Sequence, residues 1–284
     1  MKEITVKIPG YTLSGLTWGD PKNPPILALH GWLDNAHSFL SLAPFIHDKY
    51  FLIAVDLPGH GHSSHLPDGY NYHFFDAIFV VTQLIKALNV GKVHLLGHSM
   101  GACLISLVAG VSPKLIQSAY FIEALGPFSA PGDTACKQFV TYDEFLTTKE
   151  ANKKHPGYDQ FQSAVRARAA KGYVSTEIAE ILCQRGLIEI NDRYYWRHDS
   201  RLLAPSPLRM TEEQILSCLK HITVPTELLV GHEGFSFDDV IMAHRINAVP
   251  QLKVIELKGG HHIHMEKPEA VAQLLVEFLA QIKN

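Results

Sequence analysis

The chain has 284 residues and a formal net charge of −3, and 46% of its residues are hydrophobic. This length suffices for one large domain with a sizeable core, or for a domain with a modest insertion. Lysine and arginine form no dense stripe, which argues against a nucleic-acid partner. No apolar run approaches the roughly 20 residues of a membrane span, so we also expect no membrane partner.

Four cysteines occur in the sequence, at positions 103, 136, 183 and 218. They form no Cys-x-x-Cys pair and have no metal-like spacing with histidine. The N-terminal residues do not have the pattern of a signal peptide. We therefore expect reduced thiols in a cytoplasmic protein.

The first half of the chain alternates predicted strands and helices. Residues 4–8 alternate and meet a Pro-Gly turn, and residues 11–18 are the expected antiparallel partner. Continuous apolar runs, typical of parallel strands covered on both faces, occupy residues 26–29, 51–55, 93–96 and 118–122. Apolar residues at helical spacing predict helices over residues 38–46, 74–88 and 102–111. This succession predicts parallel βαβ units with right-handed crossovers.

The alternation stops after residue 126 and resumes near residue 223. In between we predict helices and no strong buried strand, with helices over residues 134–147, 158–171 and 176–185. The pattern ends with a strand over 226–230, a helix over 238–247, a strand over 252–257 and a helix over 269–283. We therefore predict an α/β core domain of residues 1–126 and 223–284 with a helical cap of residues 127–222. Such a cap would lie over the carboxyl ends of the strands, where these sheets bind ligands.

The stretch Gly97-His98-Ser99-Met100-Gly101 joins a short apolar strand to an apolar helix. A serine on such a turn, with glycine two residues away on each side, is the arrangement called a nucleophile elbow. The turn places the Ser99 hydroxyl at the N-terminus of the helix, where the dipole and free N–H groups favour developing negative charge. The motif alone also allows an N-capping serine in a glycine-rich turn.

Several motifs together resemble the α/β-hydrolase superfamily, in the superfamily's order along nearly the whole chain. They are the elbow, His30-Gly31-Trp32, residues 56–63 (Asp-Leu-Pro-Gly-His-Gly-His-Ser), and Gly260-His261 followed by His264 and Pro268. The resemblance implies an α/β fold with a mostly parallel sheet of about eight strands, helices on both faces and a cap. Residues 196–199, 201–202 and 231–234 resemble the serine hydrolase-like or carboxylesterase group of this superfamily.

A serine hydroxyl is a poor nucleophile unless a histidine takes its proton. Three histidines follow the last predicted strand, and His261 matches the superfamily's catalytic position, with His262 as the alternative. We expect His264 to pack or cap near the final helix. The cluster could instead be a metal site, but the remaining ligands are not evident nearby in the sequence. We therefore predict no metal and no cofactor.

The acid that orients the histidine departs from the usual pattern. In most of the superfamily it is an aspartate in the loop after the penultimate strand, but Gly234 stands at that position here. Glu123, at the end of the strand over 118–122, matches a second arrangement, which the haloalkane-dehalogenase subgroup uses. A carboxylate at the end of a buried strand needs a partner, and His261 would be one. We predict Glu123, with Asp238 or Asp239 as alternatives; Glu123 could also simply accept loop N–H bonds.

The same resemblance implies that the backbone N–H groups of Trp32 and Met100 form an oxyanion hole. Gly31 would let the backbone approach the substrate, and we expect Gly31, His98 and Trp196 to contact it. His30 and the Asp56 loop are expected to be architectural, and Asp34 to cap a loop.

A serine, a histidine and an acid beside an oxyanion hole suit attack on an acyl carbonyl. An aromatic-rich cap predicts an apolar pocket, so we predict a serine hydrolase that cleaves carboxylic esters of small to medium apolar substrates through an acyl-enzyme. The expected partner is the small-molecule ester, and monomer and homodimer both remain open. Alternatives on the same residues are hydrolysis of thioesters, amides or carbon–carbon bonds, or acyl transfer. A non-catalytic binding protein on this fold is the alternative from another class.

Overall fold

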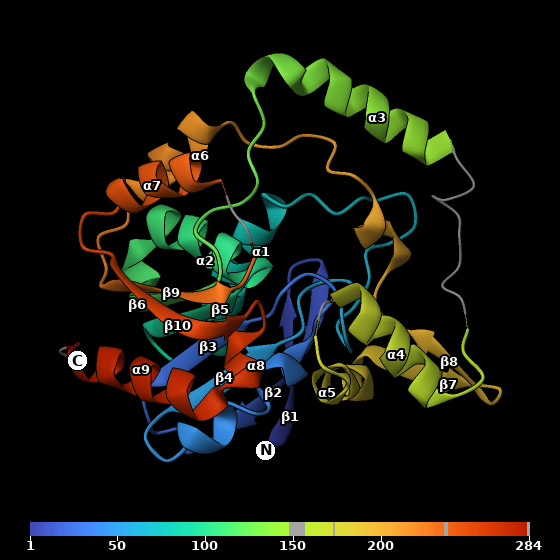
Figure 1. Ribbon diagram of the computed structural model, residues 1–284, viewed down its shortest axis with the longest axis horizontal. Coiled ribbons are helices and arrows are strands. Elements are labelled where there is room, and N and C mark those ends of the chain that lie inside the picture. Colours follow the sequence, from blue (N-terminus) through green and yellow to red (C-terminus); the bar gives the residue numbers. More distant parts are fainter. Residues whose placement is uncertain (148–156, 173, 236–237, 283–284) are drawn as a thin grey trace.

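The computed structural model describes residues 1–147, 157–172, 174–235 and 238–282. Its centre is a sheet of eight strands (Figure 1), which confirms the predicted α/β class. The strands are β1 (Lys2–Ile8), β2 (Tyr11–Trp18), β3 (Pro25–Leu29), β4 (Phe51–Val55), β5 (Val93–His98), β6 (Ile116–Ile122), β9 (Thr226–Glu233) and β10 (Lys253–Gly260). Their order across the sheet is β1-β2-β4-β3-β5-β6-β9-β10. Strand β2 is antiparallel to both β1 and β4, and the pairs from β4 to β10 are parallel.

Helices cover both faces of this sheet (Figure 1). One face packs against α1 (Asp76–Leu88), α2 (Met100–Val111) and α6 (Glu212–Leu219). The other packs against α9 (Pro268–Ala280) and two short 3₁₀ turns, η1 (Ala36–Phe39) and η2 (Ala43–Phe45). Because successive strand residues point to opposite faces, Leu95 joins the first core and Leu96 the second. The parallel strands are therefore apolar at nearly every position, as the sequence indicated.

The helices differ from the predicted ones in a few places. The single helix expected over residues 38–46 is replaced by η1 and η2, because Pro44, near the start of η2, has no N–H to donate. Two short helices were missed, α6 and α8 (Ile263–Glu266), and α7 spans Asp239–Asn247. The predicted final residue of the last helix, Lys283, lies outside the described residues. Of the described helices, none has both the length and the apolar character needed to cross a membrane.

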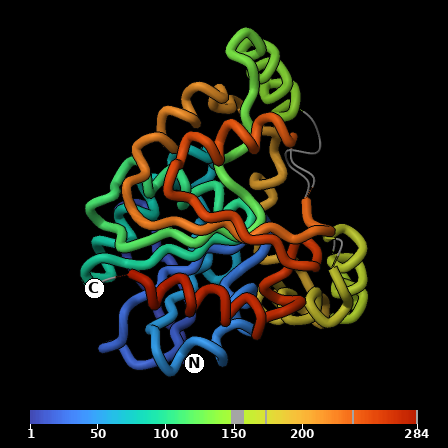
Figure 2. The backbone as a smooth tube through the Cα atoms, turned by 60° about the vertical axis from the view of Figure 1, so that its left-hand side comes forward, coloured from blue at the N-terminus to red at the C-terminus, as the bar shows by residue number. Residues whose placement is uncertain are grey.

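The segment between β6 and β9 stands outside the main sheet. It contains α3 (Ala135–Thr147), α4 (Phe161–Gly172), α5 (Thr176–Gly186) and a two-stranded sheet of β7 (Leu187–Ile190) and β8 (Arg193–Trp196). Figures 1 and 2 show α4, α5 and the hairpin together beside the main sheet, with α3 set apart from them. The hairpin was not predicted, although Asn191-Asp192, both with positive φ, form its tight turn. The division into core and cap stays a prediction.

Two side chains tie this segment to the loops that follow β3 and β4. Arg185 of α5 is only 2% exposed, and its Nε donates to Asp56 Oδ2 at 2.8 Å. Its outer nitrogens bond Glu3 on β1, with Nη1 2.7 Å from Oε1. Asn35 Nδ2 donates to the Leu182 carbonyl of α5 at 2.9 Å. The insertion is therefore held against the core by a buried charge pair as well as by apolar packing.

Replacing Arg185 by methionine removes the cation and leaves the fully buried Asp56 carboxylate without it. We expect the free energy of unfolding to fall by about 3–5 kcal/mol, the usual cost of breaking a buried ion pair. Urea denaturation followed by circular dichroism measures it. Glu3→Gln is the matched control: the Glu3 side chain is 58% exposed, so its loss should cost less than about 1 kcal/mol. Equal costs for the two variants would contradict a stabilising role of the buried pair.

Candidate active site

The turn between β5 and α2 holds Ser99 in a strained backbone conformation, with φ 51° and ψ −115°. The flanking glycines are required by packing. A Cβ on Gly97 would lie 2.6 Å from the Ala102 nitrogen, and one on Gly101 would collide with the Leu29 carbonyl. Although Ser99 precedes the first residue of α2, its side chain makes no capping hydrogen bond. The alternative interpretation as an N-capping serine is therefore wrong, and the hydroxyl is available for another partner.

That partner is His261, which lies directly after β10. His261 Nε2 is 2.9 Å from Ser99 Oγ, and His261 Nδ1 is 3.0 Å from Glu123 Oε2. Because an ionised carboxylate only accepts, Nδ1 carries the proton and Nε2 accepts from the serine hydroxyl. The three side chains thus form one continuous hydrogen-bond chain in the order needed for proton transfer from serine to histidine.

Glu123 follows β6 and is 2% exposed. Its carboxylate also accepts from the backbone N–H of Gly231 and, at 3.0 Å, from that of Phe235. A Cβ on Gly234 would overlap the same carboxylate. The position of the Glu123 carboxylate therefore requires a glycine at residue 234, because a side chain there would take the space that the glutamate occupies. One carboxylate accepts loop N–H bonds and also faces the histidine, so its contacts are compatible with both interpretations of Glu123. Its role as the catalytic acid stays a prediction.

The two alternative acids lie at the start of α7. Asp238 caps the N-terminus of α7 and accepts from the N–H groups of Val240 and Ile241, both at 3.0 Å. Asp239 lies in the first turn of the same helix. Among the described residues, the carboxylate hydrogen-bonded to His261 Nδ1 is thus that of Glu123 and not that of Asp238 or Asp239.

The other two histidines of the cluster have partners of their own. His262 Nε2 is 3.1 Å from Asp34 Oδ2, whereas the ring nitrogen that contacts Ser99 Oγ belongs to His261. His264 is fully buried, and its Nε2 is 2.8 Å from Ser38 Oγ, in line with the expected packing role. Burial, with the neighbouring His262, lowers the pKa of His264 to about 3 and keeps its ring neutral.

Asp34 and His98 lie beside His261 and His262. Asp34 is 3% exposed and pairs with Arg168 of α4 as well as with His262. Burial by itself would raise the pKa of Asp34, but His262 and Arg168 hold it well below its usual range. His98 Nε2–H donates to the His261 carbonyl at 2.8 Å. Burial and three neighbouring histidines lower the pKa of His98, so its ring is neutral.

Two apolar cavities open beside the Ser99 turn, of about 360 and 160 Å³. Trp32 and Met100, the expected oxyanion-hole residues, line both of them. Leu202 and Pro205 also line both, on a segment that sequence reasoning did not assign to the site. The apolar run Leu202-Leu203-Ala204-Pro205 was the available signal. The role of Trp32 and Met100 as oxyanion donors stays a prediction.

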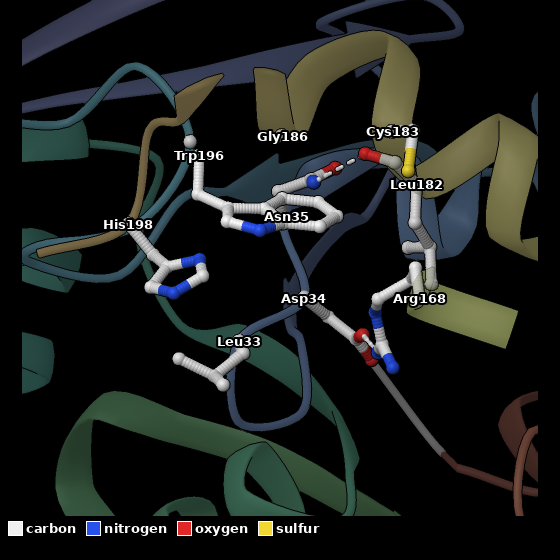
Figure 3. A pocket seen from close by; sticks show the side chains of 10 residues that line it. Leu33, Asp34, Asn35, Arg168, Leu182, Cys183, Gly186, Trp196 and His198 are labelled. Atoms are coloured by element: carbon white, nitrogen blue, oxygen red, sulfur yellow. Dashed lines mark hydrogen bonds and ion pairs between the residues drawn. The ribbon is translucent and has the colours of Figure 1, made fainter. Parts of the chain in front are cut away.

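Of the three residues expected to contact substrate, Trp196 lies in a different place. It lines a small cavity of about 10 Å³ between the insertion and the core (Figure 3), together with Asp34 and Arg168. His98 and Gly31 lie next to each other and are not among the residues that line the cavities of about 360 and 160 Å³. The contacts of Gly31, His98 and Trp196 with substrate stay predictions.

The chain is similar to known proteins over its whole length. Residues 24–157 match the family model described as the alpha/beta hydrolase fold. A probable serine hydrolase of Drosophila melanogaster is 30% identical, over 99% of this chain and 88% of that protein. Among solved structures, a hypothetical protein of Pseudomonas aeruginosa is 34% identical, with a TM-score of 0.92, 99% of this chain covered and 100% of that one. A thioesterase domain from the curacin biosynthetic pathway is 29% identical, with a TM-score of 0.85 and coverages of 98% and 99%.

Replacing Glu123 by glutamine keeps the side-chain size but removes the charge that orients His261. We expect Ser99 to react with a fluorophosphonate reagent roughly 10³–10⁴-fold more slowly, as when the acid of a similar triad is made neutral. The rate is measured by mass spectrometry of the labelled protein. Asp239→Asn is the control and should react at the wild-type rate. The reverse result would move the acid to the later loop.

The tight fit between Glu123 and Gly234 generates a second prediction. Glu123→Gly alone should abolish rapid labelling, while Glu123→Gly combined with Gly234→Asp places a carboxylate in the vacated space. We expect the double variant to label at least about tenfold faster than the single one, because orientation of the histidine is partly restored. Thermal melting of both variants is measured as well, so that a difference in labelling rate is not mistaken for a difference in folding. No recovery in the double variant would contradict the idea that the two positions share one space.

Proposed function

Because the chain belongs to the α/β-hydrolase superfamily and is a serine hydrolase-like protein, we propose that it hydrolyses carboxylic esters through an acyl-enzyme on Ser99. The observation that carries this proposal is the hydrogen-bond chain from Ser99 through His261 to Glu123. Such a chain makes a serine hydroxyl nucleophilic at neutral pH. The apolar cavities at Trp32 and Met100 support small to medium apolar substrates.

The proposed reaction proceeds in two halves. Ser99 Oγ attacks the ester carbonyl while its proton moves to His261 Nε2, and Glu123 stabilises the imidazolium that forms. The backbone N–H groups of Trp32 and Met100 would stabilise the oxyanion. The imidazolium then gives its proton to the leaving alcohol, which departs and leaves an ester on Ser99. A water molecule, deprotonated by His261, then attacks this ester. The imidazolium returns the proton to Ser99 Oγ as the bond from Ser99 to the acyl group breaks and the carboxylic acid is released.

The position of Met100 fits this role. It is the first residue of α2, and the first N–H groups of a helix have no partner within the helix. An oxyanion formed on Ser99 would therefore meet a free donor and the positive end of the helix dipole. The exposed indole of Trp32 is held by its Nε1–H bond to the Leu202 carbonyl at 3.1 Å. This bond links the proposed oxyanion loop to the segment that lines both cavities.

Thioester hydrolysis is the second candidate, supported by the similarity to the curacin thioesterase domain. The same attack and the same proton transfers serve both ester types, so the leaving group distinguishes the candidates. Matched oxygen and sulfur esters of one acyl chain compare the two directly. We expect the oxygen ester to be hydrolysed with the higher kcat/KM.

A fluorophosphonate reagent tests whether the protein is an enzyme at all. We expect the folded wild-type protein to label stoichiometrically at Ser99 and Ser99→Ala to remain unlabelled, because only the activated serine attacks the phosphorus centre. Peptide mass spectrometry locates the label. A folded wild-type protein that does not label would favour the non-catalytic binding protein.

The apolar cavities predict a preference for longer acyl chains. On a series of p-nitrophenyl esters, kcat/KM should rise from acetate up to a medium-length chain, by up to about fourfold for each methylene. This factor corresponds to about 0.8 kcal/mol per buried CH₂ group. Met100→Trp, which adds bulk to both cavities, should shift the optimum to shorter chains. A flat profile in the wild-type protein would contradict binding of the acyl chain in these cavities.

A further inference from the structure

We propose that Asp34, His98 and His262 form a buried site for one divalent transition-metal ion, for which Zn²⁺ is the best match. Two imidazole nitrogens and a carboxylate oxygen are a ligand set that Zn²⁺ accepts. The three residues are 3%, 1% and 5% exposed, respectively. They lie beside the triad, but the hydrogen bonds between the side chains of Ser99, His261 and Glu123 do not involve them.

The candidate ligand atoms are already close together. Asp34 Oδ2 is 3.1 Å from His262 Nε2 and 3.8 Å from His98 Nδ1, and all three atoms lie within 4.8 Å of one another. Tetrahedral zinc with bonds of about 2.0–2.2 Å separates its ligands by roughly 3.3–3.6 Å. Side-chain movements on the order of 1 Å or less therefore suffice to complete the three bonds.

His98 provides an independent indication. Its Nε2 must carry the proton, because it donates to the His261 carbonyl. In the neutral ring Nδ1 then carries no proton and presents a lone pair. This buried atom has no hydrogen-bond partner among the described residues, and it faces the carboxylate of Asp34. A lone pair directed at a carboxylate oxygen is unfavourable unless a cation lies between them.

The surroundings of two of the three residues, His98 and Asp34, resemble the outer shell of a metal site. A ligating histidine usually donates its other ring N–H to a backbone carbonyl or carboxylate, and a ligating carboxylate is itself hydrogen-bonded. His98 meets the first condition through the His261 carbonyl. Asp34 meets the second, since Arg168 binds Oδ1 and leaves Oδ2 toward the histidines. Figure 3 shows the Asp34 carboxylate and the Arg168 side chain facing each other.

Gly31 leaves the required space. A Cβ at this position would lie 3.0 Å from both Asp34 Oδ2 and His98 Nδ1, so any larger residue would crowd the point where the ion binds. The absence of a side chain at Gly31 therefore leaves room for the ion, besides the expected approach of substrate. Gly31→Ala should therefore weaken ion binding.

Each of the three residues lies within two positions of a residue of the proposed reaction. Asp34 is two residues after Trp32, His98 precedes Ser99, and His262 follows His261. The ring centroids of His98 and His261 are 4.9 Å apart. A dication beside His98 disfavours the imidazolium at His261, so Zn²⁺ binding should inhibit hydrolysis. This inhibitory role rests on the proposed function, whereas the binding site does not.

Calorimetric titration of the intact protein with ZnCl₂ tests the site. We expect one ion per chain in the wild type and at least about 100-fold weaker binding in His98→Gln and in His262→Gln, since each loses one ligand. His94→Gln is the matched control: His94 is 4% exposed, also on β5, and hydrogen-bonded to Ser118. His261→Gln should also keep the affinity, which separates this site from the proposed catalytic histidine.

The absence of a one-to-one complex would overturn the proposal, as would unchanged affinity in the two ligand variants or its loss in His261→Gln. Anomalous diffraction at the zinc edge from soaked wild-type crystals needs no variant to fold. It should place the ion between Asp34, His98 and His262, and an ion only at another position would overturn the site. Full esterase activity at full occupancy would overturn the inhibitory role. Failure of fluorophosphonate labelling would instead reject the proposed function and leave the binding result unaffected.

Discussion

The hydrogen bond between Glu123 and His261 is the interaction on which the rest of the site depends. A carboxylate buried at the end of a strand is costly unless donors surround it. Here the N–H groups of Gly231 and Phe235 and the Nδ1–H of His261 surround it together. The same bonds that satisfy the carboxylate set the tautomer of the histidine and direct Nε2 toward Ser99. The hydrogen bonds that stabilise the buried Glu123 carboxylate therefore include the one that orients His261 for the proposed reaction.

The sheet topology explains how three distant residues meet. Ser99 follows β5, Glu123 follows β6 and His261 follows β10, and the carboxyl ends of these parallel strands lie at one edge. Glu123 and His261 are 138 positions apart in the chain, and Ser99 and His261 are 162 apart. Strand β9 lies between β6 and β10, and its end supplies the Gly231–Gly234 loop that cradles Glu123. A different order of β5, β6, β9 and β10 in the sheet would move Ser99, Glu123 and His261 apart.

Charged side chains of the insertion extend this arrangement. Arg168 of α4 pairs with Asp34, and Arg185 of α5 pairs with Asp56, on the loops that follow β3 and β4. Both loops pack close to the triad and the two larger cavities. Because each buried carboxylate needs its arginine, the insertion cannot move far without leaving a charge unpaired. The position of the insertion and the shape of the site are thus coupled through two ion pairs.

The sequence by itself determined what depends on local signals. The apolar runs predicted the parallel strands, and Gly97 and Gly101 marked the turn that lifts Ser99 above the sheet. The motifs around His30 and Asp56 indicated the superfamily. These features were predictable because strand patterning and sharp turns depend on residues close together in the chain. The hairpin turn Asn191-Asp192 was also a local signal, but weaker periodicity around it hid the two short strands.

Only the tertiary structure decided which distant groups meet. The sequence allowed Glu123, Asp238 or Asp239 as the acid that faces His261. The packing of Gly234 against Glu123 distinguishes Glu123 from the other two. The sequence likewise offered no reason to place Asp34 and His98 beside His262, since the three residues come from segments far apart in the chain: the loop after β3, the end of β5 and the turn after β10. Side-chain convergence of this kind depends on strand order and on which space a neighbouring residue leaves open. Neither quantity is encoded in the spacing of residues along a single sequence.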